Sequence, residues 1–252
     1  MIKSLDHWPD FGTDLDLLTC SYEKKVTAIM TERFGASIET PSWSDRVAQK
    51  ANFRIPGLSE LVEIHFGRLG QAGENTKLAA RIMDRRVKRE VAGKFFWVPA
   101  PEERILLATL QRLYRHYYVR ICNIVNTEEQ VDSASVDFDD LRRAAKCAGI
   151  WPGVATYLRL VSGYTHHYSG RHLALPKRVW LATSFGIEKV YANTGFLRVP
   201  LFPQDSQLYV RQLIRAMRRR DAAGAMRLGM VAPLAVAANI RFKVSWNEHG
   251  TW

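Results

Sequence analysis

Residues 14–19, DLDLLT, alternate acidic and apolar side chains, and this period of two predicts a β-strand. Because side chains alternate along a strand, Asp14 and Asp16 are expected on one face, roughly 6–7 Å apart. Two ionised carboxylates at that spacing repel each other unless a cation lies between them. The leucines favour a buried strand that presents its acids at the mouth of a site. The alternative is a pair of surface acids beside a turn.

A second predicted strand offers a third acid. Residues 60–66 read ELVEIHF, and their alternation places Glu63 and His65 on the same face. Glu63 is the better candidate for the third acid, and Glu60, at the edge of the strand, is the weaker one. Carboxylates on neighbouring strands, together with substrate phosphates, are how Mg²⁺ is usually held in two-metal phosphoryl-transfer sites. We expect His65 either to face this cleft or to be an ordinary hydrogen-bonded strand histidine.

The remainder of the first part of the chain predicts one helix and two further strands. A helix is expected over residues 21–35, with Ser21 as its cap and Gly35 as its end. Its apolar face is formed by Val26, Ile29, Met30 and Phe34. Strands are expected at residues 36–40 and 46–55, and a loop at 67–76.

From about residue 97 the apolar period changes to 3.6, which is typical of helices. The expected helices cover residues 99–125, 137–149, 152–163, 206–224 and 225–240. We therefore predict an α+β protein. A small mixed sheet with flanking helices occupies residues 1–96, and a mainly helical, basic domain occupies residues 97–252.

The positive charge is concentrated in the second part. The net charge is +11, but residues 1–80 hold 9 Lys/Arg against 11 Asp/Glu, whereas residues 81–252 hold 27 against 14. A basic surface attracts polyanions such as nucleic acid, nucleotide phosphates or an acidic partner. The plainer interpretation is that the charge serves solubility.

Several classes of protein are disfavoured by the sequence. No apolar run has the length of a membrane span, and charges occur too early for a signal peptide. Cys20, Cys122 and Cys147 are far apart and odd in number, which indicates reduced thiols. We expect a cytoplasmic protein without a membrane partner. A P-loop is absent from the sequence, so a Walker-type kinase is excluded.

Four stretches in order carry a family resemblance: IKS (2–4), DLDLL (14–18), VEIHF (62–66) and VPAPEERILLATLQRLYRHYY (98–118). They resemble the nucleotidyltransferase superfold shared with polymerase β. More specifically, they resemble a family of uncharacterised bacterial nucleotidyltransferase-like proteins. The superfold's signature is a Gly-Ser or Gly-Gly pair, then Asp-x-Asp on a strand, then a distant third acid. Here Lys3 stands in place of the glycine, and the likeness covers about residues 1–160.

The resemblance implies an activity and a set of roles. A nucleoside monophosphate would move from an NTP such as ATP to a hydroxyl or phosphate acceptor, with pyrophosphate as the leaving group. Asp14, Asp16 and Glu63 would be the catalytic, metal-holding acids for two Mg²⁺ ions. Ser4 and nearby backbone N–H groups would steady the triphosphate, and Lys3 would supply charge. The acceptor is either a small molecule or a tRNA or protein.

Basic residues of the second part are candidates for phosphate contacts. Arg112 and Arg115, in RLYRHYY, either face the nucleotide phosphates or belong to the solvated side of a packed helix. Arg215, Arg218 and Arg219 either bind acceptor or nucleic-acid phosphates or form a solvated helix face.

Two further alternatives concern the role of the histidine-rich stretch and whether the protein is an enzyme. The histidines of residues 164–172 are expected in a polar loop rather than a zinc site, because no acid or cysteine joins them at a usual ligand spacing. The alternative to an enzyme is a catalytically silent nucleotide- or nucleic-acid-binding module on the same fold.

Overall fold

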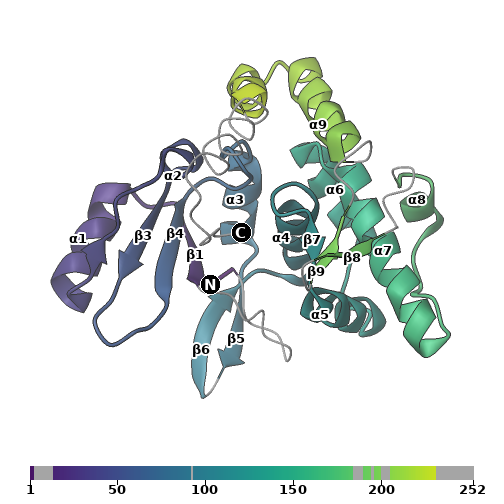
Figure 1. The fold of residues 1–252 in the computed structure, drawn as a ribbon, viewed down its shortest axis with the longest axis horizontal. Coiled ribbons are helices and arrows are strands. Elements are labelled where there is room, and N and C mark those ends of the chain that lie inside the picture. Colours follow the sequence, from purple (N-terminus) through teal and green to yellow (C-terminus); the bar gives the residue numbers. More distant parts are fainter. Residues whose placement is uncertain (3–13, 92, 184–189, 194–195, 200–204, 231–252) are drawn as a thin grey trace.

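A computed structural model describes residues 1–2, 14–91, 93–183, 190–193, 196–199 and 205–230 (Figure 1). Lys3, Ser4 and residues 231–240 of the helix expected over residues 225–240 lie outside this described part. The architecture is α+β, as predicted: a four-stranded mixed sheet with flanking helices is followed by a largely helical part.

The sheet is built around two parallel strands that the sequence predicted. β1 (Asp14–Thr19) pairs in parallel with β4 (Leu61–Phe66). β3 (Lys50–Arg54) runs antiparallel to β4, and the short β2 (Ser37–Ile38) forms the edge. The strand order is therefore β1-β4-β3-β2.

The two faces of this sheet differ in character. One face is apolar, with a buried cluster that includes Phe53, Val62 and Ile64, and α1 (Glu23–Phe34) covers it through Met30. The opposite face carries Asp16, Glu63, His65 and Lys50. In Figure 1, α1 lies on one side of the sheet and the helical part lies on the other. The polar face therefore turns toward the rest of the molecule.

Three predictions for the first part need correction. Ser21 does not cap α1, because the N-cap is Tyr22 without a side-chain bond, while Gly35 ends the helix at φ 60° as expected. The predicted apolar face is too wide, since Ile29 and Phe34 are 39% and 53% exposed. The strand expected over residues 46–55 starts only at Lys50, because its first residues belong to a short helix, α2 (Trp43–Ala48). Its Ser42 capping box, which satisfies the first N–H groups, explains why a helix forms there.

The segment between the sheet and the helical part contains elements that the sequence did not predict. α3 (Thr76–Asp84) contributes Leu78, Ala79 and Ile82 to the helical core rather than to the sheet cluster. β5 (Val87–Val91) and β6 (Lys94–Val98) form a separate antiparallel hairpin.

The long helix expected over residues 99–125 is wrong as a single element. α4 (Pro101–Leu113) ends before Tyr117, which adopts a positive φ of 56° that no helix contains. The chain continues as β7 (Tyr118–Val119) and then α5 (Ile121–Asp132). β7 pairs with β9 (Phe196–Arg198), which pairs with β8 (Tyr191–Asn193), so pairing across the chain overrides the local helical pattern.

The remaining helices follow the prediction more closely. α6 (Phe138–Ala148) starts at its Asp137 cap and ends at Gly149, as expected. α7 (Trp151–Ser169) is longer than predicted, so His166 and His167 lie on a helix and not in a loop. α8 (Lys177–Trp180) and α9 (Ser206–Arg218) follow. The single helix expected over residues 206–224 is wrong, because α9 ends at Arg218 and Arg220 adopts a positive φ of 57°; a separate helix covers residues 222–230.

Candidate metal and phosphate site

The parallel register places two carboxylates side by side. Asp16 on β1 is directly opposite Glu63 on β4, and their side chains share the polar face of the sheet. Asp16 is completely buried and Glu63 is 4% exposed. Burial of an ionised carboxylate is costly unless charges or hydrogen bonds compensate, so this pair requires nearby cations.

His65 joins the pair as the sequence suggested, since it is two residues beyond Glu63 on the same strand face. Its Nε2 lies 3.4 Å from Oδ1 of Asp16 and 2.9 Å from Oε1 of Glu63. One ligand atom from each of the three side chains lies within 4.8 Å of the others. Within the described ranges this is the one such group of three histidine, cysteine or acidic side chains.

Lys50 supplies a positive charge that the sequence analysis missed. It is opposite His65 in the antiparallel β3–β4 pair, and its Nζ contacts Oε2 of Glu63. The same Nζ lies 3.0 Å from Oδ1 of Asp45, on α2. The Lys50 side chain is only 8% exposed, so it forms a buried bridge between two acids.

These cations hold the acids in their charged forms. Burial opposes ionisation of Glu63, but the hydrogen bond from His65 and the charges of Lys50, His65 and Arg115 outweigh it and lower its pKa. Burial likewise opposes ionisation of Asp45, yet hydrogen bonds from Ser42 and the charge of Lys50 leave its pKa below the ordinary value.

The acids in turn favour a protonated imidazole. Burial alone would lower the pKa of His65, but its hydrogen bonds and charge interactions with Asp16 and Glu63 raise it. The site therefore pairs buried carboxylates with two basic side chains on the same sheet face, Lys50 and His65. Such a cluster offers oxygen ligands to a divalent cation and positive groups to a phosphate.

The other predicted residues are placed as follows. Asp14 lies in β1, two residues before Asp16, and its side chain is outside the described part of the structure. Glu60 precedes β4 and is exposed, so it does not join the cluster. Arg115 is half-buried and its charge acts on Glu63. Arg112 is 3% exposed, with its guanidinium 5.2 Å from the ring centre of Tyr118.

The candidates on α9 and in the histidine-rich stretch lie elsewhere. Arg215 and Arg218 are exposed on α9, and the exposed Arg219 caps its C-terminal end. These arginines line two hollows described below. The ring of His166 stacks on that of His172, with centres 3.9 Å apart.

Comparison with known proteins gives no family assignment. No family model, no curated protein and no solved structure matches the chain. Among the described helices, none is long and apolar enough to cross a membrane. The function therefore has to be inferred from the residues of the site.

Proposed function

We propose that the chain is a Mg²⁺-dependent nucleotidyltransferase that moves a nucleoside monophosphate from an NTP to a hydroxyl or phosphate acceptor. One observation carries the proposal. Asp16 and Glu63, both buried, stand opposite each other on parallel neighbouring strands, with basic groups at hydrogen-bonding distance. Buried like charges in register are costly, and a phosphoryl-transfer site is a reason to keep them.

The donor set fits Mg²⁺ in its chemistry. Carboxylate oxygens are the ligands that Mg²⁺ prefers, and Asp16 and Glu63 provide them within a few ångströms of each other. Asp14 is the further acid proposed for the pair of ions. A bound Mg²⁺ would neutralise phosphate charge and orient the triphosphate. His65, with its raised pKa, is better suited to hydrogen bonding than to ligating Mg²⁺.

The basic residues are assigned to the phosphates. Lys50 has a flexible stem and bridges Glu63 and Asp45, so it can exchange a carboxylate for a phosphate oxygen when substrate binds. Arg115, whose charge acts on Glu63, and Lys3 with Ser4 are the other proposed phosphate contacts. Arg112 is buried against Tyr118, so we assign it no phosphate contact. Glu63 is proposed to take the proton of the acceptor hydroxyl.

The acceptor is a small molecule, an RNA or a protein, and one experiment addresses both activity and acceptor. The protein is incubated with Mg²⁺, each α-labelled NTP in turn, and a fractionated cell extract. We expect label in one fraction with wild type and with Glu60→Gln, an exposed acid at the edge of the same strand. Asp16→Asn should give none. Absence of labelled product with all four nucleotides, or equal labelling by Asp16→Asn, would contradict the proposal.

A second candidate function is favoured by Lys50. Because its ammonium group already neutralises Glu63, the fold can hold these acids without a metal, as a catalytically silent nucleotide-binding module would. The two candidates differ in metal dependence. Binding of NTP that is unchanged by removing Mg²⁺, with no transfer of label, would support the silent module.

A further inference from the structure

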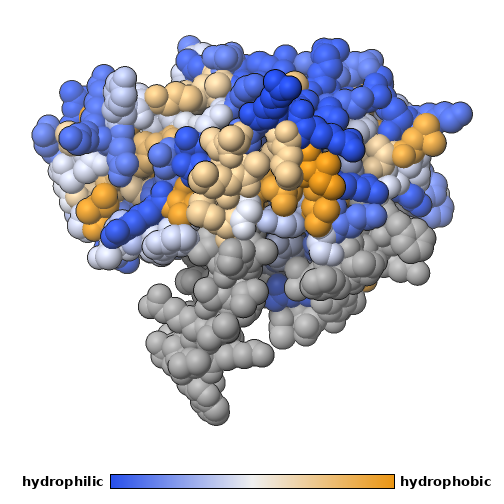
Figure 2. All heavy atoms as spheres, turned by 90° about the horizontal axis from the view of Figure 1, so that it is seen from above, coloured by the Kyte–Doolittle hydropathy of each residue, from blue (hydrophilic) through white to orange (hydrophobic). Residues whose placement is uncertain are grey.

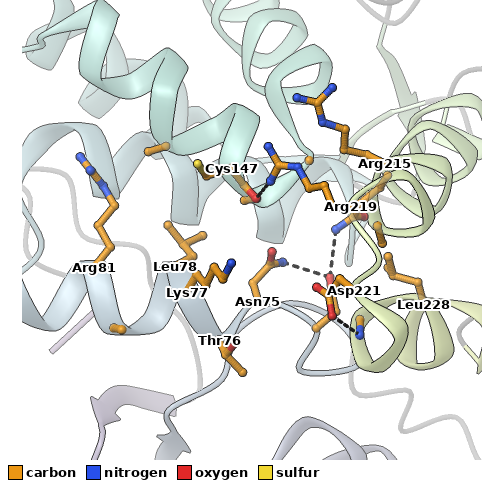
Figure 3. A pocket seen from close by; sticks show the side chains of 18 of the residues that line it. Asn75, Thr76, Lys77, Leu78, Arg81, Cys147, Arg215, Arg219, Asp221 and Leu228 are labelled. Carbon is orange, nitrogen blue, oxygen red and sulfur yellow. Dashed lines mark hydrogen bonds between the residues drawn. The ribbon is translucent and has the colours of Figure 1, made fainter.

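A large hollow lies between α3, α6 and α9, on different elements from the carboxylate cluster. Its volume is about 940 Å³, and residues 220–228 close one end of it. Figure 3 shows Lys77 on one wall, with Arg215 and Arg219 on the facing helix. The lining includes three acidic side chains, Glu74, Asp84 and Asp221, and seven basic ones: Lys77, Arg81, Arg85, Arg143, Arg215, Arg219 and Arg220.

Part of this positive charge is already used within the fold. Arg81 lies 2.7 Å from Oε1 of the buried Glu103 and also contacts Asp140. Arg85 lies 3.2 Å from both of these acids. Arg143 is 3.1 Å from Asp140. These arginines tie α3, α4 and α6 together, so their charge is largely neutralised.

At the other edge of the hollow, the basic side chains make no ion pairs of this kind with the described residues. Within the described ranges, Lys77, Arg215 and Arg220 have no carboxylate partner, and Arg219 donates to the backbone carbonyl of Cys147. All four side chains are exposed. Exposed cations that make no direct ion pair, in a hollow where basic side chains outnumber acidic ones, attract an anionic ligand.

The basic surface continues across α9. The lining of a second hollow of about 500 Å³ includes Lys146, Arg211, Arg215 and Arg218, and among the described residues that line it none is acidic. Arg215 borders both hollows. Positions 211, 215 and 218 are spaced by four and three residues, so they follow one face of the helix. α9 lies at the upper edge in Figure 1, and that side, in Figure 2, is mostly hydrophilic around a band of apolar side chains.

We propose that this surface binds the phosphate backbone of a nucleic acid strand. Two adjoining basic hollows suit a chain of phosphates better than a single nucleotide. Among the described residues, no aromatic side chain lines the larger hollow, and Trp151 at the second hollow is buried. Binding therefore rests on phosphate contacts, which carry no direct sequence information. The site does not depend on the proposed transferase activity, although an RNA acceptor would be held in this way.

The test is fluorescence anisotropy of the full chain with a labelled 12-nucleotide RNA and a DNA of the same sequence. The variant Lys77→Gln/Arg215→Gln/Arg220→Gln removes three charges from the hollow. The matched control Lys24→Gln/Lys25→Gln/Arg33→Gln removes three exposed charges from α1.

We expect wild type and control to bind within about twofold of each other, and the hollow variant to bind at least tenfold more weakly at 0.1 M salt. The slope of log K against log salt should be about 2 units shallower for that variant, since each phosphate contact to a single strand contributes about 0.7. RNA should also protect amides of residues 206–218 from hydrogen exchange in the wild type, which requires no variant.

Three results would overturn the proposal. They are no binding of either strand at 0.05 M salt, an equal loss in the variant and the control, and competition by inorganic tripolyphosphate as strong as that by RNA at equal phosphate concentration. Binding of RNA alone, or of both RNA and DNA, supports the proposal, and the comparison shows whether the surface selects RNA over DNA. An Asp16→Asn protein that has lost transferase activity should still bind RNA, so the two proposals can fail separately.

Discussion

Replacing Lys50 by methionine removes the buried cation between Glu63 and Asp45 while keeping an unbranched side chain. The three side chains are only 8%, 6% and 11% exposed, so water cannot take over the role of the ammonium group. Breaking a buried charge pair by removing one partner typically costs about 3–5 kcal/mol of folding free energy. We expect Lys50→Met to lose stability in that range in EDTA at pH 7.

The assay is urea unfolding of wild type and variant at pH 7 and pH 5. The loss should shrink at pH 5, because without Lys50 the buried Glu63 keeps only His65 as its close cationic partner and takes up a proton more readily than in the wild type. Mg²⁺ should recover part of the loss, since a metal ion held by Glu63 supplies the missing charge.

A matched control lies on the same strand. Arg54 pairs with Glu39 at 2.9 Å, but these side chains are 56% and 41% exposed. Arg54→Met should therefore cost less than about 1 kcal/mol. An equally small loss for Lys50→Met would refute the buried bridge. A large loss that Mg²⁺ leaves untouched would refute the assignment of Glu63 as a metal ligand.

Two further predictions concern the helical part. A methyl group on Gly153 of α7 would lie 2.5 Å from the ring of Tyr114, so Gly153→Ala should lower the free energy of unfolding by about 1–3 kcal/mol, measured by thermal unfolding. On the same helix, a methyl group on Gly163 would have no atom of the described residues within 4 Å. Gly163→Ala should therefore raise the free energy of unfolding by up to about 1 kcal/mol. Burial raises the pKa of Asp205 to about 8, which gives a stability contribution that is full below about pH 4 and is lost as pH rises to about 8. Asp205→Asn should remove this decrease in stability with rising pH. If the free energy of unfolding of wild type and variant changed in parallel between pH 5 and pH 8, the prediction would be wrong.

The sheet core was predictable because its signals are local. The alternation in residues 14–19 and 60–66 identified β1 and β4, and it placed Glu63 and His65 on one face. The Asp137 cap and Gly149 bounded α6 for the same reason. In each case a period or a terminal residue is enough to decide the element.

The missed features depend on pairings between distant segments. Lys50 enters the site only because β3 pairs antiparallel with β4 in a register that sets it opposite His65. A single strand pattern does not specify that register. Likewise, the helical period through residues 112–118 hides the break at Tyr117, since β7 forms by pairing with β9 far along the chain.

The arginines of α9 illustrate a third limit. Their number was evident in the sequence, but which cations are neutralised was not. Arg81 and Arg85 are neutralised by acids of α4 and α6, whereas Arg215 faces the same hollow without such a partner in the described structure. Which arginines are neutralised depends on the packing of α3 against α6, which the sequence does not specify.

The central claim is that the buried acids on β1 and β4 bind a metal ion that in turn binds the phosphates of a nucleoside triphosphate. Its most direct test is calorimetric titration of a non-hydrolysable NTP analogue, with Mg²⁺ and with EDTA, into wild type, Asp16→Asn, Glu63→Gln and the exposed-acid control Glu60→Gln. We predict that wild type and Glu60→Gln bind only with Mg²⁺ and that Asp16→Asn and Glu63→Gln lose binding. Equal binding in EDTA, or full Mg²⁺-dependent binding by Asp16→Asn, would contradict the claim.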